Sequence, residues 1–305
     1  MLDVKGKTAF ITGGVSGIGL GIAKVFARSG IKTVMSYRNE EHRKAAEAYF
    51  KARGETVHFV KLDVMDREAF ARAAAETERV FGKVHILVNN AGVSVFGPTD
   101  EATYDDYDWI MGVNFGGVVN GLVSFIPYLK KHGEEGHIVN VASMAAFLPG
   151  PQAGIYTASK YAIRGLTESI RDNLAPYRIG VSLMAPALTK TSAGTSGLSR
   201  PAKFANSKWD ANPQTLGEFG KIFEAGMEPE EVGEKTLRGI KRNDLYILTH
   251  PENREEFIEL TGAILAAWPD EPIPPQRQAI EEQRRAAKRE AESKVIGVGD
   301  LSVRK

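Results

Sequence analysis

Three side chains near the middle of the chain have the residue types and the spacing for proton exchange with a substrate oxygen. Tyr156 and Lys160 lie one helical turn apart, so they share one face of a helix, and Ser143 precedes the tyrosine by thirteen residues. An ammonium beside a phenol favours the phenolate, and lowering a tyrosine pKa by about three units takes roughly 4 kcal/mol. Ser143 would donate a hydrogen bond to the substrate oxygen. This set suits hydride chemistry between a secondary alcohol and a ketone.

A glycine-rich stretch near the start of the chain would hold the hydride carrier. Residues Thr12–Gly19 read TGGVSGIG, between a short apolar run and a stretch with helical spacing. Glycine allows the unusual backbone angles of such a turn and a close approach to a pyrophosphate. The helix that follows offers unpaired N–H groups and the positive end of its dipole. The strand–turn–helix context predicts a dinucleotide-binding turn.

These groups need a scaffold that brings several loops to one edge of a sheet. Short apolar runs alternate with stretches of helical spacing, and such runs are typical of parallel strands covered on both faces. The expected strands are Thr8–Thr12, Thr33–Ser36, Val57–Lys61, Ile86–Asn89, Ile138–Ala142, Val181–Ala185 and Leu245–Thr249. The expected helices are Gly17–Ser29, Glu41–Arg53, Arg67–Phe81, Tyr104–Leu129, Tyr156–Leu174, Glu228–Arg242 and Pro251–Trp268. The alternation predicts an α/β fold with a doubly wound parallel sheet (Rossmann fold), in a single domain over residues 1–270.

Two segments depart from this alternation. Residues 191–227 are rich in Ser, Gly, Pro, Lys and Asn, and so long a connection in a compact domain predicts a substrate lid with short helices. The lid aromatics either line an apolar pocket or fasten the lid to the body; they are Phe204, Trp209, Phe219 and Phe223. Residues 271–305 form a polar C-terminal helical extension, with a helix expected over Gln276–Lys294. The extension is either an exposed tail or an arm that packs on a neighbouring subunit.

The composition argues against several other classes of protein. The chain has 305 residues, with 39 basic and 38 acidic side chains, and this balance disfavours a nucleic-acid platform or a polybasic membrane binder. It has no cysteine, which excludes disulfides, thiolate catalysis and cysteine-ligated metals. The six histidines show no ligand spacing, so we expect no metal site. Residues Met1–Thr8 lack a signal-peptide pattern and we find no uncharged apolar run of spanning length, so we expect a cytoplasmic protein.

Taken together, the motifs resemble those of the short-chain dehydrogenase/reductase family. To the glycine-rich turn and the Ser143…Tyr156-x-x-x-Lys160 pattern, the chain adds Asn-Asn-Ala-Gly over Asn89–Gly92, after its fourth expected strand. The resemblance covers residues 4–249, and the joint pattern is specific where each motif alone is weak. It implies an NAD(P)-dependent oxidoreductase that acts on CH–OH groups.

The resemblance also implies which residues bind and react. The catalytic set is Asn114, Ser143, Tyr156 and Lys160. The cofactor-binding set is Gly13, Ser16, Gly17, Ile18, Gly19, Arg38, Asp63, Val64, Asn90, Ala91, Gly92, Tyr156, Lys160, Pro186 and Thr191. In the family, the residue at Asn114 anchors a water relay to the lysine, and the one at Thr191 meets the nicotinamide carboxamide. Lys160 also binds the nicotinamide ribose. Asp63 matches the position beside the adenine, and it is equally a candidate N-cap of the next helix.

The end of the second strand favours NADP over NAD. NAD-binding folds of this kind carry an acid there, on the ribose 2′-hydroxyl, whereas this chain has Arg38 and reaches a carboxylate only at Glu40. The Arg38 guanidinium either pairs with a 2′-phosphate or is an ordinary solvated side chain. Ser16 stands where NADP-using members often have a basic residue. The chain therefore has only one of the two basic residues that indicate NADP binding, namely Arg38. Ala187 stands where members usually have glycine, which predicts a different start of the lid.

The substrate side suggests a bulky apolar or aromatic alcohol or ketone. Phe147 and Leu148, after Ser143, usually lie on this side in the family's fold. The stretches Tyr104–Trp109 and Ser199–Lys203 look similar to bacterial members that act on lignin-derived aryl alcohols. The alternatives are a 3-oxoacyl-thioester reductase and a non-catalytic nucleotide-binding relative; the intact catalytic set argues against the second. The resemblance further implies a homodimer or homotetramer with a small-molecule substrate and no nucleic-acid or membrane partner.

Overall fold

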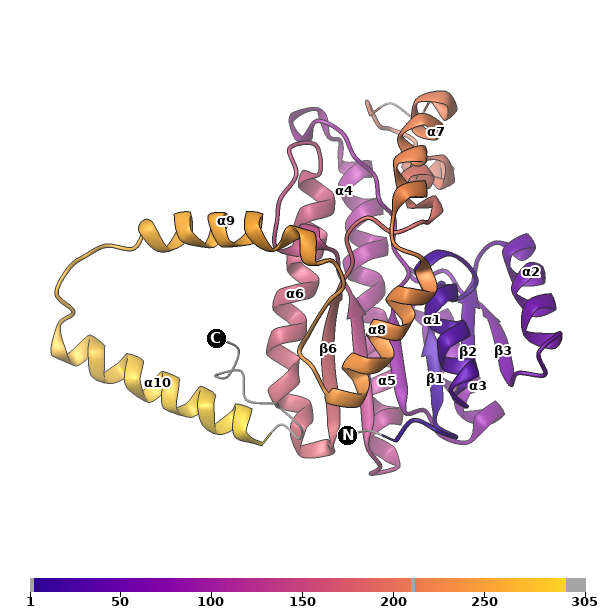
Figure 1. The fold of residues 1–305 in the computed structure, drawn as a ribbon, viewed down its shortest axis with the longest axis horizontal. Coiled ribbons are helices and arrows are strands. Elements are labelled where there is room, and N and C mark those ends of the chain that lie inside the picture. Colours follow the sequence, from indigo (N-terminus) through magenta and orange to yellow (C-terminus); the bar gives the residue numbers. More distant parts are fainter. Residues whose placement is uncertain (1–2, 210–211, 295–305) are drawn as a thin grey trace.

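The protein is built on one seven-stranded sheet whose neighbouring strands are all parallel (Figure 1). The computed structural model describes residues 3–209 and 212–294. The strands are β1 (Thr8–Ile11), β2 (Lys32–Tyr37), β3 (Val57–Lys61), β4 (Ile86–Asn89), β5 (Gly136–Val141), β6 (Ile179–Ala185) and β7 (Tyr246–Leu248). Their order is β3-β2-β1-β4-β5-β6-β7. The chain changes direction across the sheet between β1 and β4, which is where such folds bind nucleotides, beyond the carboxyl ends of the strands.

Helices cover both faces of this sheet (Figure 1). They are α1 (Gly17–Arg28), α2 (Glu40–Lys51), α3 (Arg67–Phe81), α4 (Tyr104–Met111), α5 (Gly117–Lys131), α6 (Gly154–Leu174), α7 (Pro213–Ile222), α8 (Pro229–Arg242), α9 (Arg254–Ala266) and α10 (Pro275–Ser293). One buried apolar cluster joins α1, α2 and α8 to the sheet, and a second joins α3, α4, α5 and α6 to its other face. The predicted doubly wound α/β fold is confirmed.

Burial on both faces explains why the strands read as apolar runs. Every residue of β1, β4, β5 and β6 is buried, whereas the edge strand β7 alternates between exposed and buried positions. The expected strands begin and end within two residues of the observed ones. Strand position was readable because a central parallel strand has no solvent-facing side to interrupt its apolar pattern.

The expected helix over Tyr104–Leu129 is interrupted. A π-helical turn, Gly112–Gly116, separates α4 from α5 and carries Asn114. Contrary to our sequence expectation, the helical stretch Tyr104–Lys131 is long and apolar enough to cross a membrane by length and composition. Of its most apolar stretch of 18 residues, 56% is buried inside the protein, which is typical of a helix that packs on a sheet. A single π turn of this kind often occurs at a functional site.

The segment predicted to be a substrate lid, residues 191–227 (called the lid below), contains short helices. Its role over a substrate stays a prediction. Beside α7 the lid contains the 3₁₀ segments Ser192–Ser199, Ala202–Phe204 and Phe223–Ala225. The side chain of Phe219 lies outside the described part of the chain. Gly226 ends the lid, and a Cβ there would come within 2.7 Å of the Thr189 backbone. The return of the lid therefore lies directly against the loop from which the lid starts.

The first half of the lid is fastened to α4. Arg200 forms an ion pair with the buried Asp106 at 2.7 Å, and its guanidinium lies 4.7 Å from the centroid of the Trp109 ring. Trp209 is buried and donates a hydrogen bond to Pro98 O at 2.9 Å. Burial opposes ionisation of Asp106, but hydrogen bonds and the Arg200 charge hold its pKa below the usual value. Trp209 thus fastens the lid, which is one of the two roles that the sequence left open.

Helices α9 and α10 form an arm that stands away from the body (Figure 1). Both helices lie wholly within the described residues, and none of their residues is buried. The root of the arm is Phe257, whose ring packs edge-on against Phe147 at 5.6 Å. Phe147 is buried in that contact, so the expectation that it faces the substrate is wrong. Large apolar side chains stay exposed along the arm: Ile258, Ile264, Leu265, Trp268, Ile273 and Ile280.

Candidate active site

A cavity of about 630 Å³ lies at the carboxyl edge of the sheet. Its walls come from the glycine-rich turn after β1, the ends of β2 and β4, the segment after β5, the loop after β6 and the lid. Because all these strands are parallel, their carboxyl ends meet at one edge. The fold thereby gathers residues that are up to 210 positions apart in the sequence, from Gly13 to Phe223.

The glycine-rich turn has the geometry of a phosphate-binding turn. Gly13 and Gly17 have positive φ angles of 62° and 50°, which side chains other than glycine rarely adopt. Ser16, Gly17 and Ile18 line the cavity, and the first turn of α1 contains no acidic residue. Gly19 does not line the cavity but allows tight packing, since a Cβ there would lie 2.3 Å from Gly13 O. The turn therefore fits an anionic pyrophosphate at the N-terminus of α1.

The end of β2 presents basic side chains to the open end of this cavity. Arg38 and His42 both line it. Glu40, the first carboxylate after the strand, is turned to Arg43 with a contact of 2.6 Å. His42 was not singled out from the sequence, because a lone histidine in a polar helix start has no distinguishing pattern.

The end of β3 contributes two apolar residues to the wall of the cavity. Leu62 and Val64 line the cavity, whereas Asp63 between them is exposed and lies outside its lining. The Asp63 carboxylate accepts a hydrogen bond from Met65 N at 3.0 Å. Asp66 is the N-cap of α3, so the alternative that Asp63 caps this helix is wrong.

The Asn-Asn-Ala-Gly segment joins the ends of β1 and β4. Thr12 Oγ1 accepts hydrogen bonds from Asn90 N at 2.8 Å and from Ala91 N at 2.9 Å, and Asn90 Nδ2 donates to Thr12 O at 2.9 Å. A Cβ at Gly92 would lie 3.1 Å from Asn114 Oδ1. Asn90, Ala91 and Gly92 all line the cavity. Because Gly92 has no side chain, the Asn114 amide fits closely beside it.

The three residues predicted to react meet in this cavity. Ser143, Tyr156 and Lys160 all line it, and Lys160 Nζ lies 5.4 Å from the centroid of the Tyr156 ring. Burial lowers the pKa of Lys160 to about 8. Burial also raises the pKa of Tyr156, while hydrogen bonding from the Ser143 and Ser94 hydroxyls acts in the opposite direction.

Asn114 supports this set from behind. Its side chain accepts a hydrogen bond from Val93 N at 2.8 Å and donates to Val93 O at 3.1 Å and to Ser159 Oγ at 3.1 Å. Ser159 in turn donates to Tyr156 O at 2.6 Å. The π turn thus ties the backbone next to Ser94 to the backbone of α6 at Tyr156.

Ser94 is a polar residue of the site that the sequence reasoning missed. It lines the cavity beside Ser143, and Phe96 two residues later packs on the Tyr156 ring at 5.4 Å. Ser94 and Phe96 lie two and four residues after the end of the Asn-Asn-Ala-Gly segment. Their position shortly after that segment was the only sequence signal that could have indicated them.

The loop after β6 closes the cavity against the glycine-rich turn. Pro186, Ala187, Thr189 and Thr191 line it. The Thr191 methyl group packs on Gly17, where a Cβ would lie 3.2 Å away. Thr191 also begins the first helical segment of the lid, since its hydroxyl accepts a hydrogen bond from Ala193 N at 3.2 Å.

Comparison with known proteins identifies the family. The family model described as short chain dehydrogenase matches residues 7–200, which is more than half of the chain. The chain belongs to the short-chain dehydrogenase/reductase family. It is an NAD(P)-dependent oxidoreductase that acts on CH–OH groups, and the predicted family and class of enzyme are confirmed.

Individual members of the short-chain dehydrogenase/reductase family resemble the chain over most of its length. A C alpha-dehydrogenase from Sphingobium sp. strain SYK-6 is 44% identical over 266 residues, which are 87% of each chain. The apo form of LigO from the same strain has a TM-score of 0.77 at 37% identity, over 93% of this chain and 98% of that one. A short chain dehydrogenase/reductase from Burkholderia phymatum, solved in complex with NAD, has a TM-score of 0.82 at 32% identity, over 90% and 100% of the two chains.

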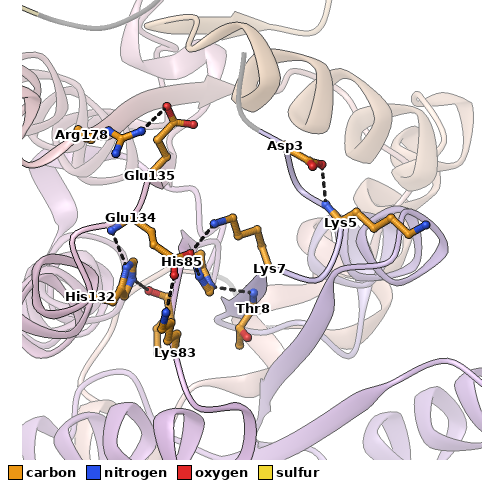
Figure 2. Close-up of polar contacts among 11 residues, drawn as sticks. Asp3, Lys5, Lys7, Thr8, Lys83, His85, His132, Glu134, Glu135 and Arg178 are labelled. Carbon is orange, nitrogen blue, oxygen red and sulfur yellow. Dashed lines mark hydrogen bonds and ion pairs between the residues drawn. The ribbon is translucent and has the colours of Figure 1, made fainter.

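A second polar cluster lies at the opposite, amino edge of this dehydrogenase's sheet (Figure 2). The Glu134 carboxylate contacts Lys7 Nζ at 2.7 Å and His85 Nε2 at 3.1 Å. It also forms a short ion pair with Lys83 Nζ. His85, His132 and Glu134 place one potential ligand atom each within 4.8 Å of the others, a grouping that we did not expect from the sequence.

The histidines of this amino-edge cluster have no ring nitrogen to spare for a metal ion. His85 Nδ1 accepts a hydrogen bond from Thr8 N at 3.1 Å, and its Nε2 faces Glu134. His132 Nδ1 accepts from Glu134 N at 3.1 Å, and its Nε2 lies 2.8 Å from Val84 O. The cluster therefore joins the starts of β1, β4 and β5.

Proposed function

We propose that the protein transfers a hydride between NADP(H) and a bulky apolar or aromatic secondary alcohol or ketone, with Tyr156 as the general acid and base. The observation that carries this proposal is a buried cation beside a phenol in the cavity. Among the described residues, Val141 O at 3.3 Å is the hydrogen-bond partner of Lys160 Nζ, and no carboxylate balances its charge. Such a cation is available to stabilise a neighbouring phenolate.

Each side chain of the set then has a distinct task. Ser143 donates a hydrogen bond to the substrate oxygen, and Tyr156 exchanges a proton with it. Lys160 favours the Tyr156 phenolate and binds the nicotinamide ribose. Asn114 holds the backbone on both sides of the tyrosine, through Val93 and Ser159. The nicotinamide ring supplies or accepts the hydride when the cofactor is bound.

The binding site for the cofactor extends from the glycine-rich turn to the loop after β6. The positive φ angles at Gly13 and Gly17 and the start of α1 suit the pyrophosphate. Arg38 suits a ribose 2′-phosphate, because Glu40 is engaged by Arg43 and leaves the end of β2 positively charged. The Burkholderia phymatum relative was solved with NAD, so cofactor choice has to be measured on this chain.

An aromatic substrate is supported by the apolar side of the cavity. Phe96 packs against the Tyr156 ring, and Phe223 of the lid lines the cavity. The two stretches with a resemblance to aryl-alcohol enzymes, Tyr104–Trp109 and Ser199–Lys203, contact one another through Asp106 and Arg200. A relative named C alpha-dehydrogenase at 44% identity supports a dehydrogenase that acts at a carbon atom of an organic substrate.

We also propose a cytoplasmic homo-oligomer in which the arm contacts a neighbouring subunit. Six large apolar side chains of the arm are more than half exposed, and isolated helices of such length are marginally stable in water. A neighbouring copy of the chain would cover this apolar surface.

A substrate screen tests the proposed function directly. Aryl ketones, aryl secondary alcohols, aliphatic ketones and 3-oxoacyl thioesters are offered with NADP(H) and with NAD(H), while the absorbance of the reduced nicotinamide is followed. We expect the highest kcat/KM for an aryl substrate with NADP(H). Preference for a 3-oxoacyl thioester would favour the alternative enzyme, and no turnover of any substrate would favour a non-catalytic relative.

A further inference from the structure

His250 follows β7 and lies buried behind the loop after β6. Its side chain is 6% exposed. Nδ1 accepts a hydrogen bond from Ala187 N at 3.0 Å, and Nε2 lies 2.9 Å from Leu188 O. Because an N–H group faces Nδ1, the ring carries its proton on Nε2 and donates it to Leu188 O. Thr249 Oγ1 also lies 2.7 Å from Nδ1, which therefore has one side-chain partner and one backbone partner. Both ring nitrogens contact the backbone of the loop after β6.

The same loop is held at two further points. Met144 N donates to Pro186 O at 2.9 Å, which ties the loop to the residue after Ser143. Met227 N donates to Leu188 O at 3.0 Å, where the lid returns to the body. Leu188 O thus has two donors, whereas His250 is the partner of the Ala187 N–H group. Removing the imidazole would orphan that N–H group and leave the carbonyl satisfied.

The position of this loop matters for the reaction. Pro186, Ala187 and Thr189 line the cavity together with Ser143 and Tyr156. Backbone polar groups in such a place require fixed partners, and a displacement of about 1 Å between reacting groups can cost about a hundredfold in rate. An anchor behind the loop sets the shape of the cavity wall without touching what the cavity binds.

We propose that His250 is a positioning residue for the reaction: through Ala187 N and Leu188 O it fixes the loop Pro186–Thr189 beside Ser143 and Tyr156. This inference rests on the proposed function for its kinetic consequence, but the anchoring itself does not. The sequence did not indicate this role, because the groups that His250 holds in the loop are backbone N–H and C=O groups, which have no residue type to recognise.

Three substitutions separate the two hydrogen bonds. His250→Asn places its Oδ1 near the position of Nδ1, so it can still accept from Ala187 N. His250→Gln places its amide N–H near the position of Nε2, so it can still donate to Leu188 O. His250→Phe keeps the ring volume and loses both bonds to the loop, together with the contact between Nδ1 and Thr249 Oγ1. His58→Asn, on β3 and paired with Glu76, is the matched control.

Two measurements are made on each full-length variant. Hydrogen exchange of the peptide that spans residues 184–192 reports on the loop without any turnover. We expect exchange at least tenfold faster in His250→Phe, near wild type in His250→Asn and intermediate in His250→Gln. Steady-state kinetics should show kcat tenfold to a hundredfold lower in His250→Phe, with NADPH binding by fluorescence titration changed less than kcat. His250→Asn should restore most of the lost kcat, and His58→Asn should match wild type.

The proposal is overturned by unchanged exchange in His250→Phe, or by faster exchange with unchanged kcat. If His250→Phe does not fold, the ranking of the other two variants decides, and equal or better rescue by His250→Gln contradicts the proposal. A wild-type protein that turns over no alcohol or ketone refutes the proposed function and with it the kinetic consequence. The exchange experiment still tests the anchoring in that case.

Discussion

At the amino edge of the sheet, Glu134 accepts from Lys7, Lys83 and His85, and these three side chains hold the pKa of its carboxyl well below the usual range. At the carboxyl edge, Lys160 is buried without a counter-charge, and burial lowers its pKa to about 8. The two edges use the same kinds of residue. They differ in whether the polar groups are already satisfied within the chain.

This difference separates a structural cluster from a binding site. A buried polar group that lacks a partner costs free energy, so folding normally provides one, as it does for the buried His85 beside Glu134. Where the chain provides no partner for a polar group, a ligand can provide one, and the group remains available for chemistry. Substitutions at the two edges should therefore have opposite effects on stability and on turnover.

The largest effect is expected for Lys160→Met. Turnover should fall about a thousandfold, because the phenolate loses its cation, and cofactor binding should weaken as well. The free energy of unfolding at pH 7 should rise by about 2 kcal/mol, because the folded protein no longer buries an ammonium whose pKa is lowered to about 8. Steady-state kinetics and denaturant titration measure the two effects.

Glu134→Gln is the matched substitution at the amino edge. It removes the charge that Lys7 and Lys83 share, so the free energy of unfolding should fall while kcat per folded molecule stays at the wild-type value. Loss of stability in Lys160→Met, or loss of turnover in Glu134→Gln, would remove the distinction between the two edges.

Acid should destabilise the protein through the amino-edge cluster. Burial, followed by the Lys7 charge, lowers the pKa of His85 to about 4, from 6.5 in the unfolded chain. Between pH 6.5 and 4 the unfolded chain takes up a proton that the folded protein does not, so stability falls as the pH falls through this window. The loss from His85 should be about 2 kcal/mol after allowance for solvent screening.

The variant His85→Asn isolates this contribution. Its side-chain oxygen can accept from Thr8 N in place of Nδ1, but the group does not titrate. Denaturant titrations at pH 7, 5.5 and 4 should show a shallower fall in stability than wild type. An unchanged slope would mean that His85 does not control the acid response.

Arg38→Ala tests the cofactor end of the cavity. If the guanidinium pairs with the 2′-phosphate, kcat/KM should fall roughly tenfold to a hundredfold for NADP(H), a charge-assisted contact of about 1.5–3 kcal/mol. It should change much less for NAD(H). Equal effects on both cofactors, or a wild-type preference for NAD(H), would refute this role, and His42→Ala shows whether the neighbouring histidine contributes.

The smallest effect on catalysis is expected when residues 276–305 are deleted. No residue of α10 lines the cavity and the arm stands away from the body, so kcat should stay near wild type (Figure 1). The assembly state, or its resistance to dilution, should decrease. Light scattering over a concentration series checks this, and an identical mass for both proteins at every concentration would show that residues 276–305 have no part in assembly.

The fold could be predicted from the sequence because its pattern is local. Central strands that are buried on both faces leave apolar runs, and β3 and β4 were predicted with the observed bounds. The π turn at Gly112–Gly116 was not, because helical periodicity continues on both sides of it. Phe147 was assigned to the wrong side, since an apolar residue does not reveal which neighbour covers it.

The site was predictable only in part for the same reason. Residue type alone indicates the chemistry of Ser143, Tyr156 and Lys160, and the fold brings the three to one cavity. Ser94 and His250 were not found, because packing in three dimensions creates their contacts with Tyr156 and with the loop after β6. Lys7, Lys83 and Glu134 come from separate loops, so no sequence motif contains their cluster.

The role of Tyr156 is tested most directly by Tyr156→Phe, studied as the intact protein with its best substrate from the screen. The ring and its packing on Phe96 remain, and only the hydroxyl that faces Ser143 and Ser94 is lost. We predict that kcat falls at least a thousandfold while NADPH affinity and the free energy of unfolding stay near wild type. Turnover within a few-fold of wild type would contradict the assignment of Tyr156 as the proton-exchanging group.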